Sequence, residues 1–170
     1  MITIAQTKFE SNFLASATGN KIFVMKLRDT FVKPACRACK EYTPSAKNPF
    51  DVVIYSEPVL CALELKSGKG KSFSFDEKII KEHQIKALAK NSEIEGVISG
   101  FVFNFTEVDN ETYFLHINDF IKFKETTDRK SIPYDFIKEK GIEIKSSIKK
   151  VNYKYDLGGF LDRIKSLTSH

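Results

Sequence analysis

The residues of this sequence best suited to chemistry are two carboxylates and a lysine within NPFDVVIYSEPVLCALELKSGKGKSF, residues 48–73. Glu64 and Lys66 are two positions apart in a run typical of a β-strand, so both side chains point to the same face. Asp51 opens the preceding β-rich run, and a hairpin of this length would bring its carboxylate close to Glu64. Neighbouring carboxylates repel unless a cation lies between them, and their oxygens suit Mg²⁺ or Mn²⁺. The spacing predicts a metal site.

Phosphodiester hydrolysis uses a site of this composition. The metal neutralises charge that develops on the phosphate and activates water, while a lysine orients that water or stabilises the anion. The alternative is an ordinary ion pair on a half-exposed strand, which stabilises a protein by about 0 to 1 kcal/mol. The spacing of Glu64 and Lys66 alone favours the ion pair. When Asp51 on a strand of its own is added, the metal site and the ion pair are about equally well supported.

Periodicity and turn signals predict the elements that would position these residues. Apolar spacing of three and four indicates helices, and β-branched and aromatic runs between turn residues indicate strands. In chain order we expect a helix over 5–20, a strand over 21–27, a loop or short stalk over 28–48, a hairpin of strands 51–55 and 59–66, a helix over 75–91 with Asp76 near its start, strands 96–105 and 112–117, a short helix capped by Asn118, and a C-terminal helix over 156–167. The order αβ(loop/stalk)ββαββ plus C-terminal helices predicts an α/β fold with a mixed central sheet flanked by helices.

Asp51, then Glu64-Leu65-Lys66, then a helix resembles the D…(D/E)xK signature of the restriction-endonuclease-like, or PD-(D/E)XK, nucleases. More specifically, LELKSGKGKSFSFD running into KEHQIKAL is similar to the RecU-type Holliday-junction resolvases, in which an ExK strand and a Ser-Phe pair precede a His-Gln on the next helix. The stretches YFLHINDFIKF and RKSIPYDFIKEKGIEI also resemble the later part of that family, so the resemblance spans roughly residues 48–145. It implies a restriction-endonuclease-like fold and a Mg²⁺-dependent endodeoxyribonuclease, with Mn²⁺ possible, that resolves Holliday junctions by paired symmetric cleavage.

The resemblance also implies roles for individual residues. Asp51 and Glu64 match the metal-binding carboxylates, Lys66 the catalytic lysine, and Gln84 the glutamine that helps complete the site. Gln84 also lies on the stripe of its helix that should face the sheet, where its amide needs a partner; it could equally be a satisfied core glutamine. Glu10 is the candidate for the first-helix acid that related nucleases bring to the metal. Its alternative is an exposed glutamate favoured by the helix dipole.

Cations near these elements are candidates for contact with DNA. The basic loop after the active strand could meet backbone phosphates or simply be solvated. The cations of the segment over 28–48 lie where the RecU family has a stalk that reaches into the junction, although this segment is short and contains the unfamiliar CRAC. The histidine before Gln84 could face DNA or be structural. The candidates are Arg28, Lys33, Arg37, Lys40, Lys69, Lys71 and His83.

Bulk properties set the remaining expectations. The 170 residues fit one domain, 1–170. A net charge of +5 is compatible with a polyanionic partner. The absence of a long apolar run or a signal pattern predicts no membrane association and a cytoplasmic protein. Three cysteines fit a reducing compartment, and the Cys36–Cys39 spacing is half of a zinc site that lacks two obvious further ligands.

Paired cleavage implies a two-fold homodimer acting on branched DNA. The C-terminal helix and the strand GFVFNF could supply the interface or could belong to the core. The short stalk suggests a phage or other mobile element as the source, and helicase or recombinase partners are possible. Two alternative functions stay open: another nuclease of the same fold, for restriction or repair, and a basic nucleic-acid-binding module whose acidic cluster is inert.

Overall fold

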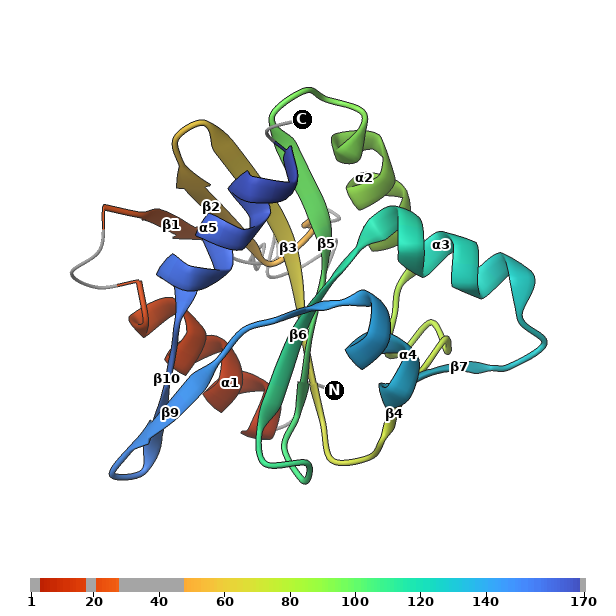
Figure 1. Cartoon of the computed structure of the whole chain (residues 1–170). Helices are drawn as coiled ribbons and strands as arrows, with labels where there is room; N and C mark the ends of the chain where they lie inside the picture. Colours follow the sequence, from red (N-terminus) through yellow and green to blue (C-terminus); the bar gives the residue numbers. More distant parts are fainter. Residues whose placement is uncertain (1–3, 18–20, 28–47, 169–170) are drawn as a thin grey trace, which may run out of the picture.

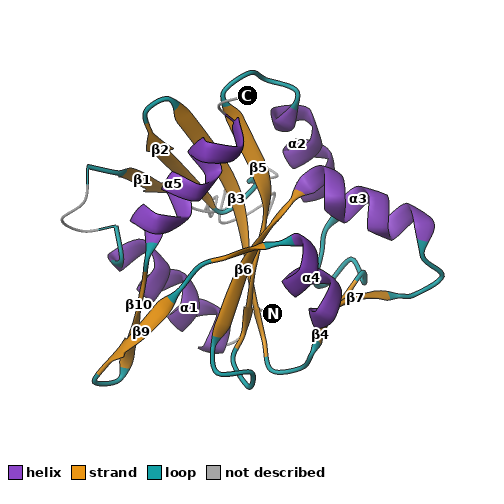
Figure 2. Ribbon diagram, viewed as in Figure 1, coloured by secondary structure: helices purple, strands orange, loops and turns teal. Residues whose placement is uncertain are grey.

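The computed structural model describes residues 4–17, 21–27 and 48–168. Five helices and ten strands alternate along these ranges, with the first helix and strand preceding the hairpin as expected (Figures 1 and 2). The elements are α1 (Ile4–Ala15), β1 (Phe23–Lys26), β2 (Val52–Ser56), β3 (Val59–Gly68), β4 (Ser72–Ser74), α2 (Glu82–Ser92), β5 (Val97–Phe105), β6 (Glu111–His116), α3 (Ile117–Thr126), β7 (Ser131–Pro133), α4 (Tyr134–Lys140), β8 (Ile142–Glu143), β9 (Ser146–Lys149), β10 (Asn152–Tyr155) and α5 (Leu157–Thr168).

The largest sheet has six strands in the order β1-β2-β3-β5-β6-β8. Its central pair, β3 and β5, is parallel, and every other pair in it is antiparallel. The predicted mixed sheet and the hairpin of β2 and β3 are therefore both confirmed. Two-stranded ladders of β4 with β7 and of β9 with β10 lie outside the main sheet, and neither was predicted from the sequence.

Each face of the sheet carries its own hydrophobic core. Helices α1 and α5 pack on one face, against apolar side chains that include Leu63 and Leu65 of β3. Helices α2, α3 and α4 cover the other face, where the phenylalanines of β5 gather. Alternation along β3 therefore sends Glu64 and Lys66 to the α2 face, opposite the two leucines. In the described part of the chain, no helix is long and apolar enough to cross a membrane.

The expected helix over 75–91 is shorter than predicted, because α2 begins only at Glu82. The preceding residues form a turn around Asp76, whose side chain accepts a hydrogen bond from the Lys78 amide at 2.8 Å and whose carbonyl accepts one from the Ile80 amide at 3.0 Å. Aspartate competes in this way with helix formation by bonding nearby backbone groups. Asp76 therefore organises the approach to the helix rather than its first turn.

One further expectation needs correction, and one pair of open alternatives is decided. The cap of α3 is His116, whose Nδ1 accepts a hydrogen bond from the Asn118 amide at 3.2 Å, so Asn118 is not the cap. The strand GFVFNF belongs to the core, since its phenylalanines are completely buried within the chain. The C-terminal helix α5 likewise directs its apolar stripe into the core.

Candidate active site

Strand pairing brings Asp51 and Glu64 together. Val52 pairs with Leu63 in the antiparallel ladder, so the next position outward sets Asp51 opposite Glu64. The Asp51 amide donates to the Leu63 carbonyl at 3.1 Å, and its Oδ2 accepts from the Leu65 amide at 2.9 Å. The backbone of β3 thus fixes the aspartate at the open end of the hairpin, close to Glu64 as predicted from the sequence.

Glu64 lies at the centre of a buried polar group. Its Oε1 accepts hydrogen bonds from Lys66 Nζ at 2.8 Å and from Gln84 Nε2 at 2.6 Å. Only 2% of the Glu64 side chain and 14% of the Lys66 side chain are exposed. A half-exposed surface ion pair, the alternative raised by the spacing, does not describe this arrangement. Burying a charged pair with so little solvent costs free energy unless further bonds compensate.

Gln84 is the side chain by which α2 reaches the strand. It is buried, its Oε1 accepts from the Lys81 amide at 3.3 Å, and the Lys66 ammonium lies 3.4 Å from the same oxygen. The glutamine is the third residue of the helix, so its bond to the backbone before the helix also caps the helix start. The partner that its buried amide required is Glu64.

The electrostatics of this group favour a cation. Burial, followed by the negative charge of Asp51, raises the pKa of Glu64 to about 8, and burial is the main reason that the pKa of Asp51 is also raised. Glu64 Oε2 is buried without a hydrogen-bond partner among the described residues. An unpartnered carboxylate oxygen beside a second carboxylate is a donor set that fits a hard divalent cation.

The fit rests on two carboxylates. Within residues 4–17, 21–27 and 48–168, no three His, Cys, Asp or Glu side chains are grouped closely enough to hold a metal between them. Glu10 is buried on α1, and its charge raises the pKa of Asp51, but its Oε2 forms an ion pair with Lys26 Nζ at 2.5 Å. Glu10 thus lies near the site but is already paired with the Lys26 ammonium, and its role as a metal ligand stays a prediction.

Gln6 is a site residue that sequence reasoning missed. Its Nε2 donates to Glu10 Oε1 at 2.7 Å and to the Leu65 carbonyl at 2.8 Å, and its Oε1 accepts from the Ser67 amide at 2.7 Å. Strand β2 pairs with β3 only as far as Leu63. Beyond that residue, the side chains of Asp51 and Gln6 bond the backbone edge of β3 that a neighbouring strand would otherwise occupy. This holds the backbone around Glu64 and Lys66 in place. The only signal in the sequence was the one-turn spacing of Gln6 and Glu10.

We expect Gln6→Met to loosen this end of β3. Methionine has similar length but cannot replace the bonds to the Leu65 carbonyl and the Ser67 amide, each of which stabilises by about 1 kcal/mol. The Ser67 amide should exchange its hydrogen roughly 5- to 10-fold faster, as measured by NMR. Ser11→Ala, an exposed change on the same helix, is the control. Unchanged hydrogen exchange at the Ser67 amide in the Gln6 variant would show that the Gln6 side chain does not stabilise this part of β3.

The predicted DNA contacts lie in different settings. Lys69 and Lys71 are exposed on the turn between β3 and β4, just past the candidate site, and His83 is half-buried in the first turn of α2. Arg28, Lys33, Arg37 and Lys40 lie outside the described residues, as do Cys36 and Cys39. Cys61 is buried within β3, where burial raises the pKa of its thiol to about 12.

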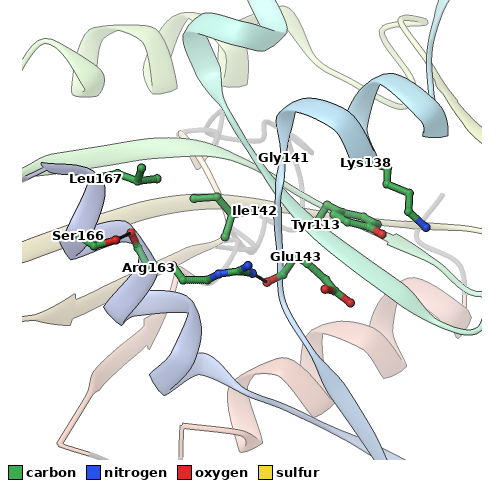
Figure 3. Close-up of a pocket in the computed structure, with 8 residues that line it drawn as sticks. All are labelled: Tyr113, Lys138, Gly141, Ile142, Glu143, Arg163, Ser166 and Leu167. Carbon is green, nitrogen blue, oxygen red and sulfur yellow. Dashed lines mark hydrogen bonds between the residues drawn. The ribbon is translucent and has the colours of Figure 1, made fainter.

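A pocket elsewhere on the molecule is separate from these residues. It lies at the β8 edge of the sheet, between α4 and α5, and its lining includes Tyr113, Lys138 and Arg163 (Figure 3). Arg163 Nη1 donates to the Glu143 carbonyl at 3.3 Å there. None of the carboxylates near β3 lines it. The candidate active site is therefore a buried cluster at the end of β3, not this hollow.

Known proteins resemble this chain in sequence and in fold. The family model described as RecU: Recombination protein U matches residues 52–156, which include Glu64, Lys66 and Gln84. The SPbeta prophage-derived protein YotM of Bacillus subtilis (strain 168) is 38% identical over 161 residues, covering 88% of this chain and 80% of that protein. Among solved structures, Archaeoglobus fulgidus Hjc, a Holliday junction resolvase, superposes with a TM-score of 0.54 at 15% identity, over 81% of this chain and 94% of Hjc. At that identity the match to Hjc supports the fold.

Proposed function

This chain belongs to the Recombination protein U family, and from that premise we propose that it is a metal-dependent, structure-selective endonuclease that resolves four-way DNA junctions. One observation carries the proposal: Lys66 of β3 and Gln84 of α2 both bind the buried carboxylate of Glu64, and Asp51, just before β2, lies opposite it. The prophage origin of YotM accords with the expected phage or mobile-element source. The shared fold with Hjc, itself a Holliday junction resolvase, adds support for the class of reaction.

The proposed division of labour follows from the contacts. Asp51 and the free Oε2 of Glu64 would hold a Mg²⁺ or Mn²⁺ ion, which supplies charge neutralisation at the phosphate and a more acidic bound water. Gln84 keeps Glu64 oriented by binding its other oxygen. Lys66, held by Glu64 and Gln84 and slightly exposed, is placed to donate to a phosphate oxygen or to the attacking water.

Substrate contacts and assembly belong to the same proposal. Lys69 and Lys71 would meet backbone phosphates next to the site, with His83 and the cations Arg28, Lys33, Arg37 and Lys40 of the stalk segment as further DNA contacts. Resolution requires two nicks in symmetric positions, so the active form would be a homodimer with one site in each subunit.

The test is to incubate the protein with labelled four-way junction and with linear duplex of equal length, with Mg²⁺ and with a chelator. We expect metal-dependent paired nicks in the junction and little cleavage of duplex. We expect Asp51→Asn and Lys66→Ala each to abolish the cleavage of the junction. Equal cleavage of duplex would indicate a restriction or repair nuclease instead. DNA binding without any cleavage, with Mg²⁺ as well as with the chelator, would indicate a non-catalytic nucleic-acid-binding module.

A further inference from the structure

The hairpin of β9 and β10 is a basic projecting element of the described structure. Residues 145–155 read KSSIKKVNYKY, with four lysines and no acidic residue. Figure 1 shows this hairpin extending from the body of the molecule beside α1, with its turn farthest out. A small protruding element with a run of like charges needs a partner of opposite charge or stays solvated.

The base of the hairpin is firmly anchored. Tyr155 is buried, its ring contacts Phe9 and Phe13 of α1, and its amide donates to Ser16 Oγ at 2.9 Å. Asn110 Nδ2 also donates to the Tyr155 hydroxyl at 3.2 Å. Helix α1 therefore connects the hairpin on one side with Glu10 of the candidate site on the other, so the two have a fixed relative position.

The outer part of the hairpin carries cations without counter-charges. The ladder pairs Lys149 with Asn152 and Ser147 with Lys154, so both lysines share one polar face, and Lys150 lies in the turn. All of these lysines are exposed, and none forms an ion pair with any residue the structure describes. Phosphate groups of a polyanion would supply the missing partners.

We propose that the polar face and turn of the β9–β10 hairpin bind the sugar-phosphate backbone of DNA outside the catalytic site. This inference rests on the proposed function for the nature of the polyanion. The anchored base and the connection through α1 favour DNA already held at the site over an anionic membrane. The contacts position the nucleic acid and carry no sequence information.

The test measures DNA binding in chelator, where no cleavage occurs, by anisotropy over a range of salt concentrations. A variant with Lys149, Lys150 and Lys154 changed to Gln should bind at least about 10-fold more weakly, and the slope of log affinity against log salt should decrease by roughly 2 to 3, about 0.9 for each lost phosphate contact. The matched control changes Lys86, Lys90 and Lys122 to Gln. These are exposed lysines of α2 and α3, so both variants have the same net charge.

Each result decides the matter. A loss confined to the hairpin variant supports the inference. Equal losses of DNA affinity in the two variants would show that only the net charge matters and would overturn the inference. Wild-type affinity in the hairpin variant would also overturn it. Binding of the wild type to phosphatidylglycerol vesicles that the hairpin variant loses, with DNA binding unchanged, would also overturn it. If the wild type binds no DNA at all, the proposed function fails instead.

The two aliphatic side chains of the hairpin provide an internal check. Ile148 and Val151 are 64% and 71% exposed, close to the lysines but without charge. Changing both to Thr should leave the salt slope as in the wild type, because phosphate contacts are unaffected. A decrease in slope as large as that of the lysine variant would show that the hairpin acts through its shape or stability, contrary to the inference.

Discussion

Glu64→Gln is expected to unfold at a higher temperature than the wild-type protein and to cleave four-way junctions about 10³-fold more slowly. The two effects have one cause. Glu64 is buried beside Asp51, has an oxygen without a described hydrogen-bond partner and has a pKa raised to about 8. The metal-free fold therefore loses stability whether it keeps this carboxylate charged or takes up a proton to neutralise it. The same charge is what a divalent cation would require.

Glutamine fits the site that Glu64 leaves. Its carbonyl oxygen can accept the hydrogen bonds from Lys66 and Gln84 that Glu64 Oε1 accepts at 2.8 and 2.6 Å. Its amide nitrogen can donate towards the Asp51 carboxylate, which removes a repulsion between like charges. The side-chain volume is conserved, so no cavity opens. The gain in stability therefore comes from removing the charge and from this new hydrogen bond.

The measurement combines thermal unfolding in chelator with junction cleavage in Mg²⁺. Glu143→Gln, an exposed carboxylate on β8, is the matched control and should resemble the wild type in both assays. A Glu64→Gln protein that cleaves at the wild-type rate would refute the catalytic assignment. One that is less stable than the wild type would show that the carboxylate makes a stabilising contact.

The core of the site could be predicted from sequence because its geometry is local. The two-residue period of a strand sets Glu64 and Lys66 on one face, and the short SEP turn leaves little freedom in where Asp51 arrives. Gln84 followed from the apolar stripe of the predicted helix, and Gln84 and Leu88, one turn further on in α2, are both buried. These inferences needed only the register of one hairpin and one face of one helix.

The residues that could not be predicted act over long sequence distances. Gln6 contacts Leu65 and Ser67 across about sixty residues, and no local pattern reports which backbone edge lacks a strand partner. The ion pair of Lys26 with Glu10 joins a helix to an edge strand in the same way. The start of α2 was misplaced because a single side chain, Asp76, outweighs the apolar periodicity around it.

Without divalent metal, the protein is expected to lose stability as the pH rises from about 4.5 to about 8. The unfolded chain ionises Glu64 near its ordinary pKa of 4.5, whereas the folded protein does so only near about 8. Between these values the folded state holds a proton that the unfolded state has lost, so raising the pH favours unfolding. The loss should reach a few kcal/mol and level off above the folded-state pKa.

Other groups titrate in the same range and must be separated. Asp51 acts in the same direction, because its pKa is also raised. His116 acts in the opposite direction, because burial lowers its pKa and the folded protein gains stability as this histidine deprotonates. Comparison with Glu64→Gln removes the contribution of His116, which both proteins share, and the variant should show a much flatter dependence on pH.

A divalent cation should reverse the trend, since it favours the charged forms of Glu64 and Asp51 and binds the folded state. Urea unfolding at about pH 5 and about pH 8.5, each with chelator and with millimolar Mg²⁺ or Mn²⁺, measures the effect. We expect the metal to stabilise the wild type mainly at the higher pH and to leave Glu64→Gln almost unchanged. Parallel pH curves for the two proteins in chelator would show that Glu64 does not titrate in this range. Equal stabilisation of both by metal would place the cation elsewhere, because a ligand that binds only the folded state must act through the side chains that hold it.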